Sequence, residues 1–233
     1  EQHWLPTDFA LAGLASEGRL EGEASIDSNL QRLDRSYSCE IHIPFGRAGL
    51  ASLDLAPGRD VHIPFCAHKC GYCDFASLAG VDHLADRYLD ALEREFALQL
   101  GTPQPVDTIF VGGGTPTRLD IRGLERLSAM IREWLILAPN GEWTVEANPG
   151  TLDEDKADLL AKAGVNRISL GAQSFHPELL KQLERNHSPG EVERAAEIVD
   201  RRFPRWSLDL IFGVPGSTLS QWEHDLDHAL SLA

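Results

Sequence analysis

Residues 61–73 read VHIPFCAHKCGYC, a short apolar run that leads directly into three cysteines. The run, residues 61–65, is rich in β-forming residues and has the length of a buried strand. Cys66, Cys70 and Cys73 follow it with the spacing C-x3-C-x2-C. This stretch therefore predicts a strand whose carboxyl end carries a thiol-rich loop, and the chain beyond it repeats the order strand, loop, helix.

Four more apolar runs predict strands, at residues 107–111, 143–147, 167–170 and 207–212. Strands and helices thus alternate five times from residue 61 onward, which predicts βα units around a parallel sheet. The alternation alone fits a doubly wound sheet and a complete or partial barrel equally well. In both folds a ligand binds at the carboxyl ends of the strands, so the residues that follow each strand form the candidate site.

Helices are expected between these strands, because apolar residues recur there every three or four positions. The clearest runs cover residues 82–100 and 124–135. Thr151 and Thr218 each stand three residues before a Glu or Gln, which is the spacing of a capping box, and they are expected to begin the next helices.

Composition limits the classes of function. The chain has 233 residues, of which 42% are hydrophobic and 24% charged, and its formal net charge is −15. This is a globular composition, and the acidic balance argues against binding to a nucleic-acid backbone or to an anionic membrane surface. No apolar run approaches the ~20 residues of a membrane span, and no export signal opens the chain. We expect a cytoplasmic protein with no integral membrane segment and no nucleic-acid partner.

Residues 1–59 differ from the rest and are expected to form an N-terminal extension of uncertain structure, with a core at residues 60–233. The extension is rich in Gly, Ala, Ser and Leu and has weak periodicity. Its segment IHIPF, residues 41–45, nearly repeats VHIPF at residues 61–65. Coincidence or a local strand explains the similarity better than a functional role does.

The three clustered cysteines predict a metal centre, because such a cluster in a chain without export signals indicates metal or redox chemistry more often than disulfides. Three thiolates can hold three corners of a [4Fe–4S] cube and leave the fourth iron open to another ligand. A structural zinc site is the alternative, with Cys39 or His68 as the fourth ligand.

Other polar residues gather at the expected strand ends. The glycines at 112–114 bring the backbone close to a ligand or simply form a tight turn. Glu146 and Asp209 can accept hydrogen bonds from an amine or a ribose of a ligand, or they can have a structural role by capping helices or pairing with cations. Gln173 can have either the ligand-binding or the structural role. Arg185 faces solvent or binds a carboxylate with its fork. We expect His187 to be a surface or capping residue, and the tryptophans to be core: Trp134, Trp143 and Trp222.

At these residues the chain resembles the radical S-adenosylmethionine (SAM) superfamily. The C-x3-C-x2-C spacing and the segment GGGTP at 112–116 are similar to its motifs. Longer strings resemble its oxygen-independent coproporphyrinogen III oxidase group: VHIPFC at 61–66, GYCDF at 71–75, EANPG at 146–150, NRISLG at 166–171, QSF at 173–175 and DLI at 209–211. The resemblance covers about residues 60–233. It implies a partial (β/α) barrel of the radical SAM type, truncated at the C-terminus, with about five βα units.

Within that group the chain is more similar to the HemW type, the haem chaperones, than to the oxidases. The oxidases usually carry a fourth cysteine where this chain has Phe75. The resemblance implies a [4Fe–4S] cluster held by Cys66, Cys70 and Cys73, with SAM chelating the open iron. It implies cofactor contacts at Tyr72, Gly113, Gly114, Thr115, Glu146, Gln173, Arg185 and Asp209.

The implied role is to bind haem and deliver it to an acceptor protein, with a flavodoxin or ferredoxin as electron donor. Reduction of the cluster would cleave SAM to a 5′-deoxyadenosyl radical. The rival within the group is a coproporphyrinogen III oxidase, which decarboxylates propionates by radical chemistry. No catalytic residue is assigned from the sequence, and a non-catalytic zinc module stays open as a further alternative.

Overall fold

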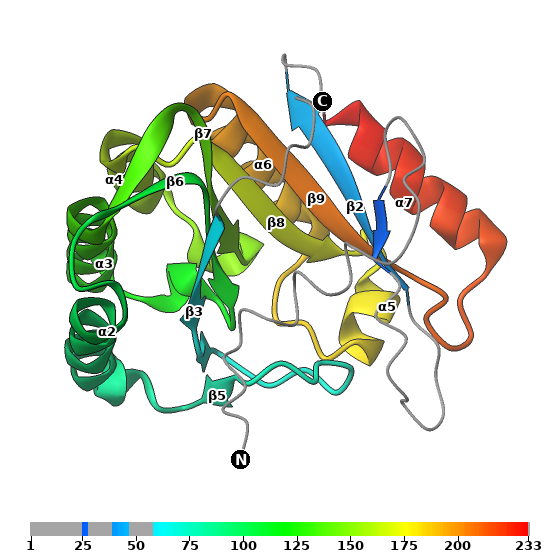
Figure 1. Ribbon diagram of the computed structural model, residues 1–233. Coiled ribbons are helices and arrows are strands. Elements are labelled where there is room, and N and C mark those ends of the chain that lie inside the picture. Colours follow the sequence, from blue (N-terminus) through cyan, green and yellow to red (C-terminus); the bar gives the residue numbers. More distant parts are fainter. Residues whose placement is uncertain (1–24, 28–38, 47–57, 233) are drawn as a thin grey trace.

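A single sheet organises the chain, and five of its strands are parallel. The computed structural model describes residues 25–27, 39–46 and 58–232. The parallel strands lie side by side in chain order (Figure 1). They are β3 (Gly58–Ile63), β6 (Gln104–Gly113), β7 (Leu135–Ala147), β8 (Arg167–Gln173) and β9 (Arg205–Phe212). Because their order never reverses, the sheet has no doubly wound switch point, and the prediction of a partial barrel is confirmed.

Helices follow the strands, as the apolar spacing predicts. They are α2 (Ala85–Leu100), α3 (Ile121–Trp134), α4 (Glu154–Ala163), α5 (Pro177–Gln182), α6 (Pro189–Arg202) and α7 (Leu219–Ser231). Figure 1 shows α2, α3 and α4 on the outer side of the curved sheet. Among the described residues, no helix combines the length and the apolar character that crossing a membrane requires.

The two faces of the sheet differ in polarity. On β8, Ile168, Leu170 and Ala172 are fully buried in the apolar core. The alternate positions of β7, β8 and β9 include the buried polar residues Thr144, Ser169 and Ser207. Parallel sheets that are packed on both faces have strands of continuous hydrophobic residues. The alternation here therefore gives the concave face of the partial barrel a polar lining.

Pairs of these polar side chains bond across neighbouring strands. Ser169 and Ser207 lie opposite each other in the register, with their hydroxyl oxygens 3.2 Å apart. Arg167 and Arg205 both pair with Glu142, at 3.2 and 3.1 Å. The lining is thus a connected polar network that satisfies groups which would be costly to bury alone.

The edge of β9 is covered by the N-terminal region. Strand β2 (Cys39–Gly46) pairs with β9 in antiparallel orientation, and β1 (Ser25–Asp27) pairs with β2. The segment at 41–45 is therefore a strand, and its near-repeat at 61–65 lies at the opposite edge of the parallel strands. The remaining residues before Gly58 lie outside the described part of the chain, and the division of the chain at residue 59 stays a prediction.

One helix begins later than its capping pattern predicts. The N-cap of α4 is Asp153, whose carboxylate accepts a hydrogen bond from the Lys156 N–H at 2.9 Å. Thr151 instead lies in a short 3₁₀ turn, and its hydroxyl is 2.7 Å from that of Thr117. The expectation for Thr151 was wrong because a nearer carboxylate competes for the same helix end. The capping box at Thr218 is confirmed.

The two-faced sheet makes a stability prediction. Leu170 is fully buried on the helix-facing side of β8, whereas Leu98 on α2 is 87% exposed. Leu170→Ala should lower the free energy of unfolding by about 2–5 kcal/mol, because it leaves a cavity in the core. The matched change Leu98→Ala should cost less than about 0.5 kcal/mol. Urea unfolding followed by circular dichroism measures both, and equal losses would contradict this packing.

Candidate functional site

The three clustered cysteines lie on a segment that begins with β4 (Phe65–Cys66), a two-residue strand that closely follows β3. None forms a disulfide, and all three are half-buried. The Cys73 N–H donates to the Cys70 carbonyl at 3.0 Å, which closes a turn between them. Burial raises the pKa of the Cys73 thiol, and the neighbouring Cys66 and Cys70 raise it further. Cys73 therefore lies close enough to both other thiols to be affected by their charge.

The glycine-rich segment after β6 packs directly against the start of this loop. The Gly114 N–H donates to the Ile63 carbonyl and the Thr115 N–H to the Phe65 carbonyl, both at 2.8 Å. A Cβ at Gly114 would lie 2.8 Å from both of those oxygens, so a side chain has no space there. The Thr115 hydroxyl is also 3.7 Å from the Cys66 sulfur. Gly114 thus allows the segment after β6 to pack closely against the backbone at residues 63–65.

Arg185 joins the cysteine loop to the end of β8. Its guanidinium donates to the Gly171 carbonyl at 2.8 Å and to the Tyr72 hydroxyl at 3.2 Å, and reaches the Cys70 sulfur at 3.9 Å. Arg185 is half-buried, so its fork binds neutral oxygens of the site rather than facing solvent.

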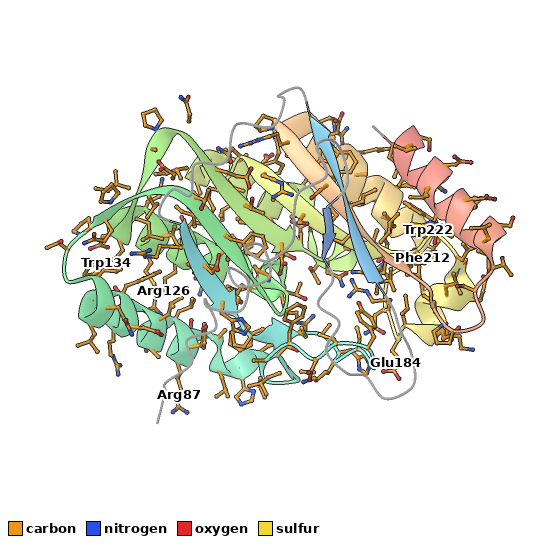
Figure 2. The ribbon with its side chains drawn as sticks, turned by 45° about the vertical axis from the view of Figure 1, so that its right-hand side comes forward. Arg87, Arg126, Trp134, Glu184, Phe212 and Trp222 are labelled. Carbon is orange, nitrogen blue, oxygen red and sulfur yellow. The ribbon has the colours of Figure 1, made fainter. Side chains whose placement is uncertain are left out.

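Glu184, the residue before Arg185, also contacts the cysteine loop. Glu184 has a left-handed backbone with φ of 54°, and its carbonyl oxygen is 3.7 Å from the Cys70 sulfur. Its carboxylate pairs with His68 Nε2 at 3.0 Å. Figure 2 labels Glu184 beside the cysteine loop. The cysteine loop is therefore fixed on two sides by side chains that come more than 110 residues later in the sequence.

Two carboxylates lie on the strands that flank β8, Glu146 on β7 and Asp209 on β9. Glu146 accepts a hydrogen bond from the Gly113 N–H at 3.0 Å. Asp209 accepts from the Ser169 hydroxyl, which is 3.1 Å from each of its oxygens. Neither residue caps a described helix, so both acceptors belong to the polar concave face. Gly113 has φ of 107°, which favours glycine, and a Cβ there would collide with the ring of His62.

The end of β8 contains buried polar atoms without partners. Gln173 is 4% exposed and has φ of 69°. Its Oε1, together with Arg185 Nε and His187 Nδ1, is buried without a hydrogen-bond partner among the described residues. Buried polar atoms are normally paired, so three orphans in one place indicate a missing polar ligand.

The expectation that His187 is a surface or capping residue was wrong. His187 is 6% exposed, and its Nε2 donates to the Ala172 carbonyl at 2.9 Å. Burial lowers the pKa of His187 to about 4, with a smaller contribution from the nearby charge of Arg185. The chain after α5 folds back over the end of β8, a long-range contact that no local pattern in the sequence reveals.

The structure also shows site residues that the motifs did not indicate, namely His62, Ser169 and Glu184. His62 and Ser169 occupy polar-facing positions of predicted strands, so the period-two alternation could have indicated them. Glu184 has no such signal. The expected cofactor contacts lie on the cysteine loop, at strand ends or at the turn after α5: Tyr72, Gly113, Gly114, Thr115, Glu146, Gln173, Arg185 and Asp209.

The spacing of the three cysteine sulfurs can be compared with that of a zinc site. Zinc bonds of about 2.3 Å would hold three thiolates about 3.8 Å apart. Among the described residues, the three cysteine sulfurs do not form a group of ligand atoms within 4.8 Å of one another. His68 pairs with Glu184, and the backbone of Cys39 lies opposite Phe212 on β9, its side chain being outside the described atoms. The three sulfurs thus do not stand at the spacing of a zinc site, and the cluster stays a prediction.

Comparisons with known proteins agree with this arrangement. The family described as the Radical SAM superfamily matches residues 61–229. The heme chaperone HemW of Bacillus subtilis is 45% identical over 181 residues, which is 74% of this chain and 46% of that protein. HemW of Escherichia coli is 42% identical over 178 residues, 74% of this chain and 47% of that protein.

A solved structure shares the fold. Coproporphyrinogen III oxidase (HemN) from E. coli, a radical SAM enzyme, superposes with a TM-score of 0.70 at 29% identity, over 76% of this chain and 42% of that one. The chain thus spans about half the length of the curated relatives it matches.

The buried histidine makes stability depend on pH. The folded-state pKa of His187, about 4, lies below the ordinary value of 6.5. Between these values the unfolded chain binds a proton that the folded chain does not, so stability falls as pH falls. From pH 7 to pH 5 the wild type should lose about 2 kcal/mol more than His187→Gln, which cannot titrate. Urea unfolding at both pH values measures this difference, and identical losses would show that His187 is not buried as a neutral ring.

Proposed function

This chain belongs to the radical SAM superfamily, and on that premise we propose that it provides the cofactor-binding core of a haem chaperone of the HemW type. Membership of the superfamily implies a [4Fe–4S] cluster and SAM as cofactors. The observation that carries the proposal is the loop of three free cysteines, fixed at the carboxyl ends of the strands in a chain up to 45% identical to haem chaperones.

In this proposal Cys66, Cys70 and Cys73 hold the cluster. The three thiols are free and half-buried, and they do not all lie within 4.8 Å of one another, whereas a single zinc ion would hold them about 3.8 Å apart. A reduced cluster of this kind supplies the electron that cleaves SAM. The protein's part is positional: Arg185 and Glu184 hold the cysteine loop against β8, and Gly114 lets the segment after β6 pack beneath it.

SAM would bind beside the loop, along the polar strand ends. Its amino group and ribose hydroxyls are hydrogen-bond donors, and Glu146 and Asp209 offer carboxylate acceptors there. The unpartnered Gln173 Oε1 is a third buried acceptor. Tyr72 and Thr115 border the cysteines, and Gly113 presents backbone in place of a side chain. Of these groups, only Gln173 Oε1 is a buried atom without a hydrogen-bond partner among the described residues.

The haem role rests on similarity and on one position of the cysteine loop. Phe75 stands where the oxidases of the group usually have a fourth cysteine, and its side chain is 62% exposed. Core packing therefore does not require an aromatic residue at this position. In the proposed role the chain delivers haem to an acceptor protein and receives electrons from a small redox protein such as a flavodoxin or ferredoxin. The fold shared with HemN keeps a coproporphyrinogen III oxidase as the second candidate.

One experiment separates the two candidates. The anaerobically reconstituted chain is titrated with hemin and, in parallel, incubated with coproporphyrinogen III, SAM and a reductant. A haem chaperone should give a saturable Soret band near one hemin per chain and should pass this haem to an apo-haemoprotein, without consuming the porphyrinogen.

The control is Cys70→Ser, which removes one cluster ligand. Conversion of the porphyrinogen that depends on SAM and disappears in Cys70→Ser would establish the oxidase and overturn the chaperone. Absence of both hemin binding and conversion would refute a haem-related role for this chain.

A further inference from the structure

A second group of metal-binding side chains lies where α7 packs against the turn after β8. His176, His224 and Asp225 each offer one ligand atom, and these three atoms all lie within 4.8 Å of one another. It is the one such group among the described residues. We propose that these three side chains bind a divalent transition-metal ion, for which Zn²⁺ is the best match. The proposal does not depend on the cluster or on haem.

Asp225 is the buried member of the group. It is 1% exposed, and its two carboxylate oxygens accept hydrogen bonds from the Ser174 hydroxyl at 2.8 Å and from the Phe175 N–H at 2.7 Å. In the described part of the chain no Lys or Arg pairs with it, and the nearest basic side chain is that of His176, whose Nε2 is 3.9 Å from Asp225 Oδ1. A buried carboxylate without a cation is costly, and a metal ion on its remaining lone pairs would supply the missing charge.

His176 lies between two carboxylates, with its Nε2 3.9 Å from Asp225 Oδ1 and its Nδ1 3.6 Å from Glu178 Oε1. Its Nε2 donates a hydrogen bond to the Gln221 carbonyl at 3.2 Å, and a metal ion on this nitrogen would take the place of that proton. Glu178 is itself held by the Gln221 side-chain amide at 3.0 Å. A metal on Nε2 would leave the Nδ1 proton directed at a carboxylate, the outer partner that fixes the tautomer of a ligating imidazole.

His224 completes the set from the solvent side. It is exposed, and its ring lies 4.7 Å from the ring of His176. Zinc bonds of about 2.0–2.2 Å place neighbouring ligand atoms about 3.4 Å apart, so the three ligand atoms must move closer together, and the exposed His224 side chain has space to rotate. Two imidazoles and one carboxylate match the preference of zinc, and the exposed side leaves room for a water as the fourth ligand.

The neighbouring His228 is engaged elsewhere. Its ring stacks on Phe175, with centroids 4.1 Å apart, and its Nε2 is 3.0 Å from Glu193 Oε1. It lies one helical turn after His224 on the same helix, which makes it a matched control. A metal at the proposed site would link α7 to the turn that follows Gln173, and α5 and α7 lie next to each other there (Figure 1). The bound ion should therefore stabilise this corner of the fold.

The proposed site is tested with Zn²⁺ itself, under conditions in which the three clustered cysteines cannot bind the added zinc. Its affinity is measured by competition with a chelating dye in the cluster-loaded protein, and again in the triple variant Cys66→Ser, Cys70→Ser, Cys73→Ser. We expect one zinc per chain in both backgrounds, and a rise in melting temperature on adding it. His224→Ala should weaken binding at least tenfold and abolish that rise, whereas His228→Ala should change the affinity less than twofold.

Three results would overturn the proposal. These are no zinc binding in the triple variant, zinc binding that His224→Ala leaves unchanged, or an equal loss in His228→Ala, which would indicate a His224–His228 pair instead. Because the triple variant lacks the proposed cluster ligands, failure of the cluster assignment would leave its result unaffected.

Discussion

The guanidinium of Arg185 is the contact on which the candidate site depends. It bonds the carbonyl at the end of β8 and the Tyr72 hydroxyl, and it reaches the Cys70 sulfur. If the loop were not held in place, its three thiols would adopt many arrangements. Binding a ligand would then cost the conformational entropy that the loop loses when it becomes ordered. Arg185 removes that cost in advance, because its planar fork holds two separate segments at once.

The polar concave face explains why the fold suits a large polar cofactor. Helices on the outer side bury the apolar residues of each strand, so stability does not require the inner residues to be apolar. The inner rows instead hold Ser169, Ser207 and Asp209 in one network that ends at the strand termini. Core packing and site chemistry therefore use different residues. The residues at the carboxyl ends of the strands can change without loss of the core that holds the strands in place.

Local patterns predicted the elements well, whereas contacts between distant segments escaped prediction. The five strands and the cysteine loop followed from short apolar runs and from cysteine spacing, both of which are local. Thr151 failed because two candidate caps lie two residues apart, and only the tertiary contact with Thr117 decides between them. His187 and Glu184 escaped because their burial and backbone conformation arise from the turn after α5 folding back onto β8. The roles of individual cofactor contacts came from resemblance, not from the physics of the chain.

The central claim is that Cys66, Cys70 and Cys73 hold a cluster with one iron open to SAM. The most direct test is electron paramagnetic resonance of the chain, reconstituted anaerobically with iron and sulfide and then reduced, with and without SAM. The account predicts about four irons per chain and a signal that changes when SAM is added. The signal should be lost in Cys70→Ser and retained in Cys39→Ser. A colourless protein that takes up a single zinc ion and needs Cys39 to do so would contradict it.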